Sequence, residues 1–112
     1  MLFISVDDFL GKAYGATKLT RENEKSLALK MKEGDAEARQ AILEGYLPLV
    51  ASYVRRAPKE IQTLQTVYCC MRRLEESVDS FDFLQDSESF THHLSLRLRR
   101  SVEKCIADHS HS

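Results

Sequence analysis

Six side chains near the C-terminus have the types and spacing of a nucleic-acid contact. They are His93, Leu96, Arg97, Arg99, Arg100 and Lys104. Positions 93, 96, 97, 100 and 104 step by three and four, so they share one stripe of a helix, which we expect opposite the core-facing side. Cationic side chains on such a stripe can hold phosphates, with Arg99 nearby as a further contact. A basic face that is merely solvated is the alternative interpretation.

Other reactive residue types lack a catalytic or metal-binding arrangement. His92 and His93 are adjacent, so on a helix they point about 100° apart. Neither these two nor His109 and His111 have a carboxylate or cysteine at complementary spacing for a metal. No nucleophile–base pair, glycine-rich phosphate loop or paired acid–base site occurs. We therefore expect no enzyme, no metal, no cofactor and no small-molecule substrate.

Length and charge restrict the possible functions further. The 112 residues, 43% of them hydrophobic and 29% charged, suit one domain over 1–112 with a single modest core. A net charge of −1 argues against a uniformly basic nucleic-acid-binding protein, so any such contact must come from a local patch. Apolar runs fall short of the roughly 20 residues that cross a bilayer, and no signal pattern opens the chain, so we expect no membrane association.

The three cysteines indicate the redox compartment. Cys69, Cys70 and Cys105 are odd in number and lack the CxxC spacing. This favours reduced thiols and a cytoplasmic location over a disulfide role. Cys69 and Cys70 are also neighbours, which on a helix cannot face one site.

Apolar residues that recur every three or four positions predict an all-α domain of about five helices. The expected segments are a leading helix in 5–18, a helical hairpin with a following helix in 19–57, a long helix in 59–82, a last helix in 89–108 and a tail at 109–112. Ser5, Thr20 and Asp35 are expected N-caps. Gly34 is expected to take the left-handed conformation that closes a helix. Pro48 lacks an amide donor and predicts a kink or a restart.

The same periodicity predicts which side chains are buried. The expected core contains Leu27, Met31, Ile42, Leu47, Val50, Val54, Leu64, Leu74, Val78, Phe81, Leu94, Leu98 and Val102. On the last helix, Cys105 and Ile106 fall on the same core-facing arc.

Residues 19–50, LTRENEKSLALKMKEGDAEARQAILEGYLPLV, also form a specific pattern. The matched positions are Thr20, Glu24, Leu27, Ala28, Gly34, Asp35, Ala38, Arg39, Leu47, Leu49 and Val50. The pattern resembles the start of the conserved core of sigma-70 family bacterial transcription initiation factors. The resemblance extends over roughly 5–108, because the end of the long helix matches the family's L-x-x-A-V-x-x-F-D and the last helix is similar to FSTYAxWWIRQAIxxAIAD.

This resemblance implies a fold like sigma region 2 with its preceding region 1.2-like segment. It also implies RNA polymerase core as a partner, through the clamp helices of the large β′ subunit. The family's polymerase-binding stretch has a sequence like DLIQEGNIGL, and here it is QTVYCCMRRL, which keeps hydrophobic positions and replaces the polar ones. The residues implied to bind polymerase are Gln65, Tyr68, Cys69, Met71, Arg72 and Arg73.

The resemblance gives the last helix a DNA-facing role. In sigma factors, the tyrosine and two tryptophans that open the minus-ten promoter element and stack on its single strand match His93, Leu96 and Arg97. Leu96 offers no stacking face, so phosphate contacts are the expected mode. In residues 1–112 we expect no counterpart of the minus-thirty-five-binding domain of a full sigma factor. One hypothesis is a sigma-like transcription protein that binds polymerase, promoter DNA or both. The other is a sigma-fold adaptor or decoy that binds a protein without DNA recognition.

Overall fold

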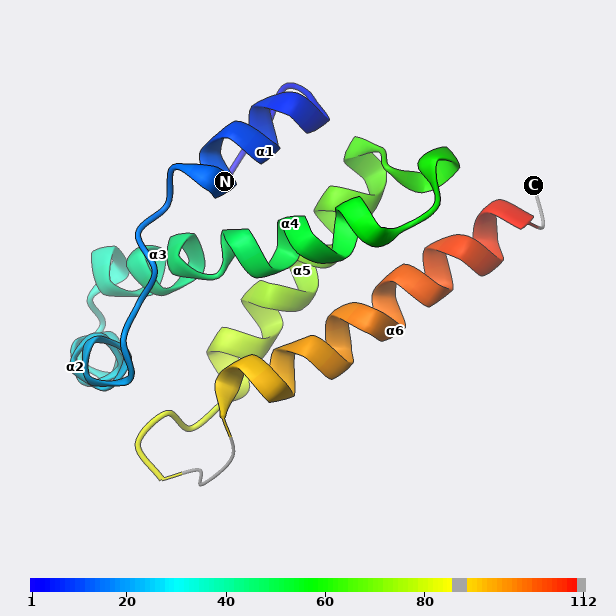
Figure 1. Cartoon of the computed structure of the whole chain (residues 1–112). Helices are drawn as coiled ribbons and strands as arrows, with labels where there is room; N and C mark the ends of the chain where they lie inside the picture. Colours follow the sequence, from blue (N-terminus) through cyan, green and yellow to red (C-terminus); the bar gives the residue numbers. More distant parts are fainter. Residues whose placement is uncertain (86–88, 111–112) are drawn as a thin grey trace.

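The computed structural model describes residues 1–85 and 89–110, in which the only regular elements are α-helices and one 3-10 turn. These elements are α1 (Val6–Tyr14), α2 (Arg21–Lys32), α3 (Ala36–Gly45), α4 (Leu47–Arg56), the 3-10 turn η1 (Lys59–Ile61), α5 (Leu64–Ser80) and α6 (Phe90–Ser110). α3 and α4 follow one another nearly end to end, α5 crosses α4, and α6 runs back along α5 (Figure 1). The predicted all-α fold class is confirmed.

Capping side chains determine where the first three helices begin. The Ser5 hydroxyl accepts the amide of the third residue of α1 at 3.0 Å, and the Thr20 hydroxyl does the same for α2 at 3.1 Å. The Asp35 carboxylate accepts two amides of α3, at 3.0 and 3.1 Å. In α1, Ser5 and Asp8 have the spacing of a capping box, but the carboxylate of Asp8 accepts the amide of Ile4 at 3.0 Å rather than that of Ser5.

The turn between α2 and α3 has the geometry of a Schellman motif. Gly34 has a φ of 89°, in the left-handed region that favours glycine. Its amide donates to the carbonyl of Met31 at 3.0 Å, and the amide of Asp35 donates to that of Lys30 at 3.1 Å. Helix closure and the next N-cap therefore fall on adjacent residues, as predicted.

Pro48 lies in the first turn of α4, where a missing amide donor costs nothing. The chain restarts there: α3 ends at Gly45, and α4 begins at Leu47. This restart is why the structure has six α-helices in its described part. The end of α3 is also tightly packed, since a Cβ atom added to Gly45 would meet the side chain of Leu19 at 2.6 Å.

The predicted core is largely confirmed. The buried members are Ile42, Leu47, Val50, Val54, Leu74, Val78, Leu94, Leu98 and Val102. Leu27, Met31, Leu64 and Phe81 are half-buried and pack against them. Cys105 is also half-buried, whereas Ile106 is 37% exposed and its predicted burial is wrong. At about 100° per residue, Ile106 lies roughly 120° from Leu94 around α6.

The observed end of α6 differs from the predicted one. α6 continues to Ser110, two residues past its expected end, so half of the predicted tail is helical and 111–112 lie outside the described residues. Of the segment 81–89 between α5 and α6, residues 86–88 also lie outside them. At its two ends the rings of Phe81 and Phe83 pack on Phe90, with centroids 5.1 and 4.8 Å from it.

Candidate functional site

Polar side chains connect α5 and α6 at regular intervals along their antiparallel contact. Arg97 Nη1 donates to the hydroxyl of Ser77 at 3.2 Å. One turn further from the connecting loop, Arg73 Nε lies 3.5 Å from the hydroxyl of Ser101. Four residues back along α5 thus correspond to four residues forward along α6. Ser77 and Ser101 are buried, so these contacts provide hydrogen bonds for hydroxyls inside the interface.

His93 belongs to the same interface. Its ring centroid lies 5.1 Å from that of Phe81 and 6.2 Å from that of Phe90. Its Nε2 is buried and has no hydrogen-bond partner among the described residues. The expectation that the stripe lies opposite the core is therefore wrong for His93 and Arg97. Arg97 lies only about 60° around α6 from Leu94, so it is on the flank that α5 covers.

The exposed part of the predicted DNA-facing set has fewer residues than the full set, and most of them are basic. Arg99, Arg100 and Lys104 are exposed, and together we name them the basic face of α6. None of the three forms an ion pair with a described residue. Leu96 is 40% exposed beside them. This surface presents three positive charges to solvent, with the exposed carboxylate of Glu103 among them, so it keeps a positive excess suited to phosphates rather than to stacked bases.

The aromatic rings at the start of α6 are used in packing. Tyr46 and Phe90 meet edge to face with centroids 4.8 Å apart, and both are buried. The Tyr46 hydroxyl donates to the Glu24 carboxylate. Burial raises the pKa of Glu24, and the charge of Arg21 lowers it to a smaller extent. A pocket of about 240 Å³ adjoins these residues, but the two buried rings offer no open face to a base.

On α5, the structure separates the residues implied to bind polymerase. Gln65 and Arg72 are exposed and Cys69 is half-buried. Arg73 is half-buried and forms an ion pair of 3.2 Å with Glu76. Met71 is only 4% exposed and packs in the core, so its side chain is not available to a partner.

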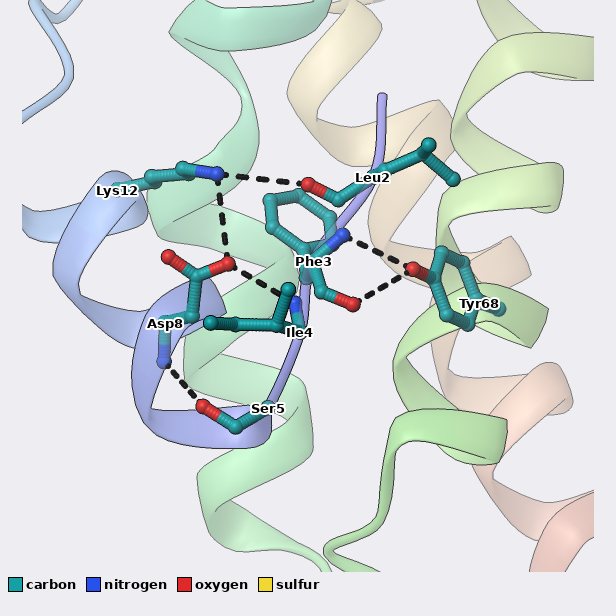
Figure 2. A network of polar contacts seen from close by, with 7 residues as sticks. All are labelled: Leu2, Phe3, Ile4, Ser5, Asp8, Lys12 and Tyr68. Atoms are coloured by element: carbon teal, nitrogen blue, oxygen red, sulfur yellow. Dashed lines mark hydrogen bonds and ion pairs between the residues drawn. The ribbon is translucent and has the colours of Figure 1, made fainter.

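Tyr68, the remaining member of that set, binds the N-terminal segment. Its hydroxyl accepts the amide of Phe3 and donates to the carbonyl of the same residue, both at 2.9 Å (Figure 2). The Phe3 side chain is 4% exposed and meets Phe9 edge to face, with centroids 5.1 Å apart. Tyr68 therefore attaches residues 1–4 to α5.

Sequence reasoning missed this N-terminal attachment. The one available pattern was a hydrophobic staple, which would pair the residue before the Ser5 cap, Ile4, with Phe9. Ile4 is 89% exposed and does not make that contact. Its amide donates to Asp8, whose carboxylate also accepts Lys12 Nζ at 3.3 Å (Figure 2). The hydrogen bond from Ile4, and to a smaller extent Lys12, hold the pKa of Asp8 below its usual value.

No protein-family model matches the chain. The described helices include none that is long and apolar enough to cross a membrane. Within 1–85 and 89–110, no three histidine, cysteine or acidic side chains form a cluster that could hold a metal ion. The exposed surfaces of α5 and α6 are the candidate interfaces.

Proposed function

We propose that this chain is a sigma-like transcription protein that contacts RNA polymerase core through α5 and promoter DNA phosphates through the basic face of α6. The observation that carries this proposal is the basic face itself, Arg99, Arg100 and Lys104. It concentrates exposed positive charge in a chain whose net charge is −1. The sigma-like pattern in 19–50 supports transcription as the context.

On α5, the proposed polymerase contact is a stripe beside the interface with α6. Positions 65, 69, 72 and 76 step by four, three and four, so they share one side of the helix. Gln65, Arg72 and Glu76 are exposed, and Cys69 is half-buried at the edge next to α6. Arg72 is its exposed cation and suits an acidic partner surface. Arg73 is less suitable, because its guanidinium already contacts Glu76 and Ser101. The proposed partner surface is the clamp-helix region of the large β′ subunit.

A second candidate is a sigma-fold adaptor or decoy that binds a protein without DNA recognition. The observation that favours it is the state of the three positions where sigma factors carry stacking aromatics. His93 is packed on Phe81, Leu96 is aliphatic, and Arg97 donates to Ser77. Under this hypothesis, α5 binds its partner and the basic face makes no contribution.

A pull-down with purified core polymerase tests the polymerase contact. We expect wild type to be retained and Arg72→Glu to lose at least tenfold in affinity. Lys18→Glu is the matched control, because it makes the same charge change at an exposed position outside the helices. Equal retention of Arg72→Glu and wild type would exclude α5 as the contact. Absence of binding by wild type would remove polymerase as the partner.

A further inference from the structure

The antiparallel register of α5 and α6 places two cysteines opposite each other. Arg97 of α6 contacts Ser77 of α5 near the connecting loop, and Ser101 contacts Arg73 one helical turn further along both helices. A further turn, four residues back on α5 and four forward on α6, leads to Cys69 and Cys105. α5 and α6 continue through these positions without interruption, so the register persists.

The local chemistry agrees with this placement. Burial raises the pKa of the Cys105 thiol, and the neighbouring Cys69 thiol raises it further through its charge and a hydrogen bond. The Thr66 side chain also hydrogen-bonds to Cys105 and lowers its pKa to a smaller extent. Both thiols are free and half-buried. A pocket of about 240 Å³, lined by Thr66, Cys105 and Asp108 among others, gives a small solute access to this end of the interface.

The third cysteine has a different environment. Cys70 has no exposed surface and belongs to the core. Burial, followed by the charges of Cys69 and Cys105, raises its pKa to about 12. A peroxide cannot reach a side chain that has no exposed surface, so Cys70 is protected from oxidation in the folded chain, whereas Cys105 lines the pocket. The fold thus gives two adjacent cysteines different environments. Cys69 faces α6, and Cys70 is buried in the core and unreactive.

We propose that Cys69 and Cys105 form a redox pair, which a peroxide converts into a disulfide between α5 and α6. One thiolate attacks a peroxide oxygen, the O–O bond breaks, and the products are a sulfenic acid and, after protonation, water. The second thiolate then attacks the sulfenic sulfur, forms the S–S bond and releases a second water once protonated. Two thiols lose two electrons and two protons, and hydrogen peroxide becomes two waters.

This inference is independent of the proposed function, because it requires neither polymerase nor DNA. The bond would join the helices at the end of their contact that lies far from the loop after α5 (Figure 1). By closing a loop of the unfolded chain, it would favour the folded state. Oxidation would therefore hold α5 and α6 in one relative position, and a thiol reductant would release them.

The test uses the full chain, reduced, freed of reductant and then exposed to hydrogen peroxide. We expect the intact chain to lose two hydrogens in mass and to remain monomeric on a non-reducing gel. Trypsin should leave the 60–72 peptide joined to 105–112, and dithiothreitol should separate them. Cys69 and Cys70 share the first peptide, so variants assign the bond. Cys70→Ser should cross-link like wild type, and Cys69→Ser should cross-link at least tenfold more slowly.

A second measurement does not depend on the folding of any variant. Wild type should form the 69–105 bond at least tenfold faster when folded than in urea, because only the fold brings the thiols together. Its oxidised form should also unfold at a higher urea concentration than its reduced form. Equal rates in the two states would overturn the proposal. So would a bond that Cys69→Ser retains, or one that joins two chains.

Discussion

Arg39 of α3 and Asp79 of α5 form a two-point ion pair across forty residues of sequence. Nε of Arg39 lies 2.8 Å from Oδ1 of Asp79, and Nη2 lies 2.9 Å from Oδ2. A guanidinium matches a carboxylate in this geometry, and lysine could not reproduce it. The pair joins the helical hairpin to the end of α5. Arg39 is one of the residues that carry the sigma-like pattern, and here it has a structural role.

The ion pair should make stability depend on pH in the acid range. The hydrogen bond from Arg39 lowers the pKa of Asp79 below its usual 3.8. Its contribution is therefore complete above pH 3.8 and is lost as the pH falls through the lower pKa of the folded state. Since both side chains are partly exposed, we expect about 0.5–1 kcal/mol.

A double-mutant cycle of Arg39→Ala and Asp79→Ala, measured by urea unfolding, isolates this contribution. The coupling energy should be present at pH 7 and should shrink as the pH is lowered from 3.8. A coupling energy of zero at pH 7 would show that the pair does not stabilise the fold.

Two leucines of α6 should respond very differently to truncation. Leu98 has no exposed surface, whereas Leu96 is 40% exposed on the opposite side of the helix. Leu98→Ala removes buried methyl groups and leaves a cavity, so it should cost about 2–5 kcal/mol. Leu96→Ala has the same effect on helix propensity and should cost under about 1 kcal/mol. Similar losses of unfolding free energy in the two variants would contradict the orientation of α6.

Replacing His93 by phenylalanine should not destabilise the domain. The His93 ring packs on Phe81, and its buried Nε2 has no described hydrogen-bond partner. His93→Phe keeps an aromatic ring and removes a desolvated polar atom, which should be neutral or stabilising by up to about 1 kcal/mol. His93→Ala loses the packing and should be destabilising by at least about 1 kcal/mol. Thermal unfolding of both variants checks that His93→Phe is more stable than His93→Ala. Equal stability of the two variants would indicate that His93 is exposed.

If the basic face of α6 holds DNA, its members should determine the salt dependence of binding. Arg99→Ala/Arg100→Ala removes two phosphate contacts and should lower the slope of log K against log salt by about two, with little change in sequence preference. Arg97→Ala is the matched control, because this guanidinium donates to Ser77 and should change the slope by less than about half a unit. A titration that gives equal slopes for the two variants would remove the basic face from the interface.

Local sequence was sufficient for most of the helix boundaries. Thr20, Asp35 and Gly34 each act on residues within one turn, so their effect does not depend on the rest of the fold. Pro48 acts in the same way, because a missing amide donor is tolerated only in the first turn. The three-to-four-residue periodicity of apolar residues predicted the main core positions for a similar reason. Helical geometry alone places Leu94 and Leu98 on the same side of α6.

Only the tertiary structure determines which side of α6 is covered by α5. Helical periodicity fixes the angle between Arg97 and Leu94, but it does not say on which side the next helix lies. α5 lies on the side of His93 and Arg97, so these two side chains are half-buried, whereas Arg100 is exposed. The contact of Phe3 with Tyr68 was likewise hidden, because residues 65 positions apart have no local signature.

The cysteines show the same division between local and tertiary information. Sequence spacing correctly indicated that Cys69 and Cys70 point in different directions, since neighbours on a helix always do. It contained no sign that Cys105 would lie opposite Cys69. That juxtaposition follows from the register of two antiparallel helices, which is set by how their side chains interlock at Ser77 and Ser101. Register is a property of the packed pair, so neither helix specifies it alone.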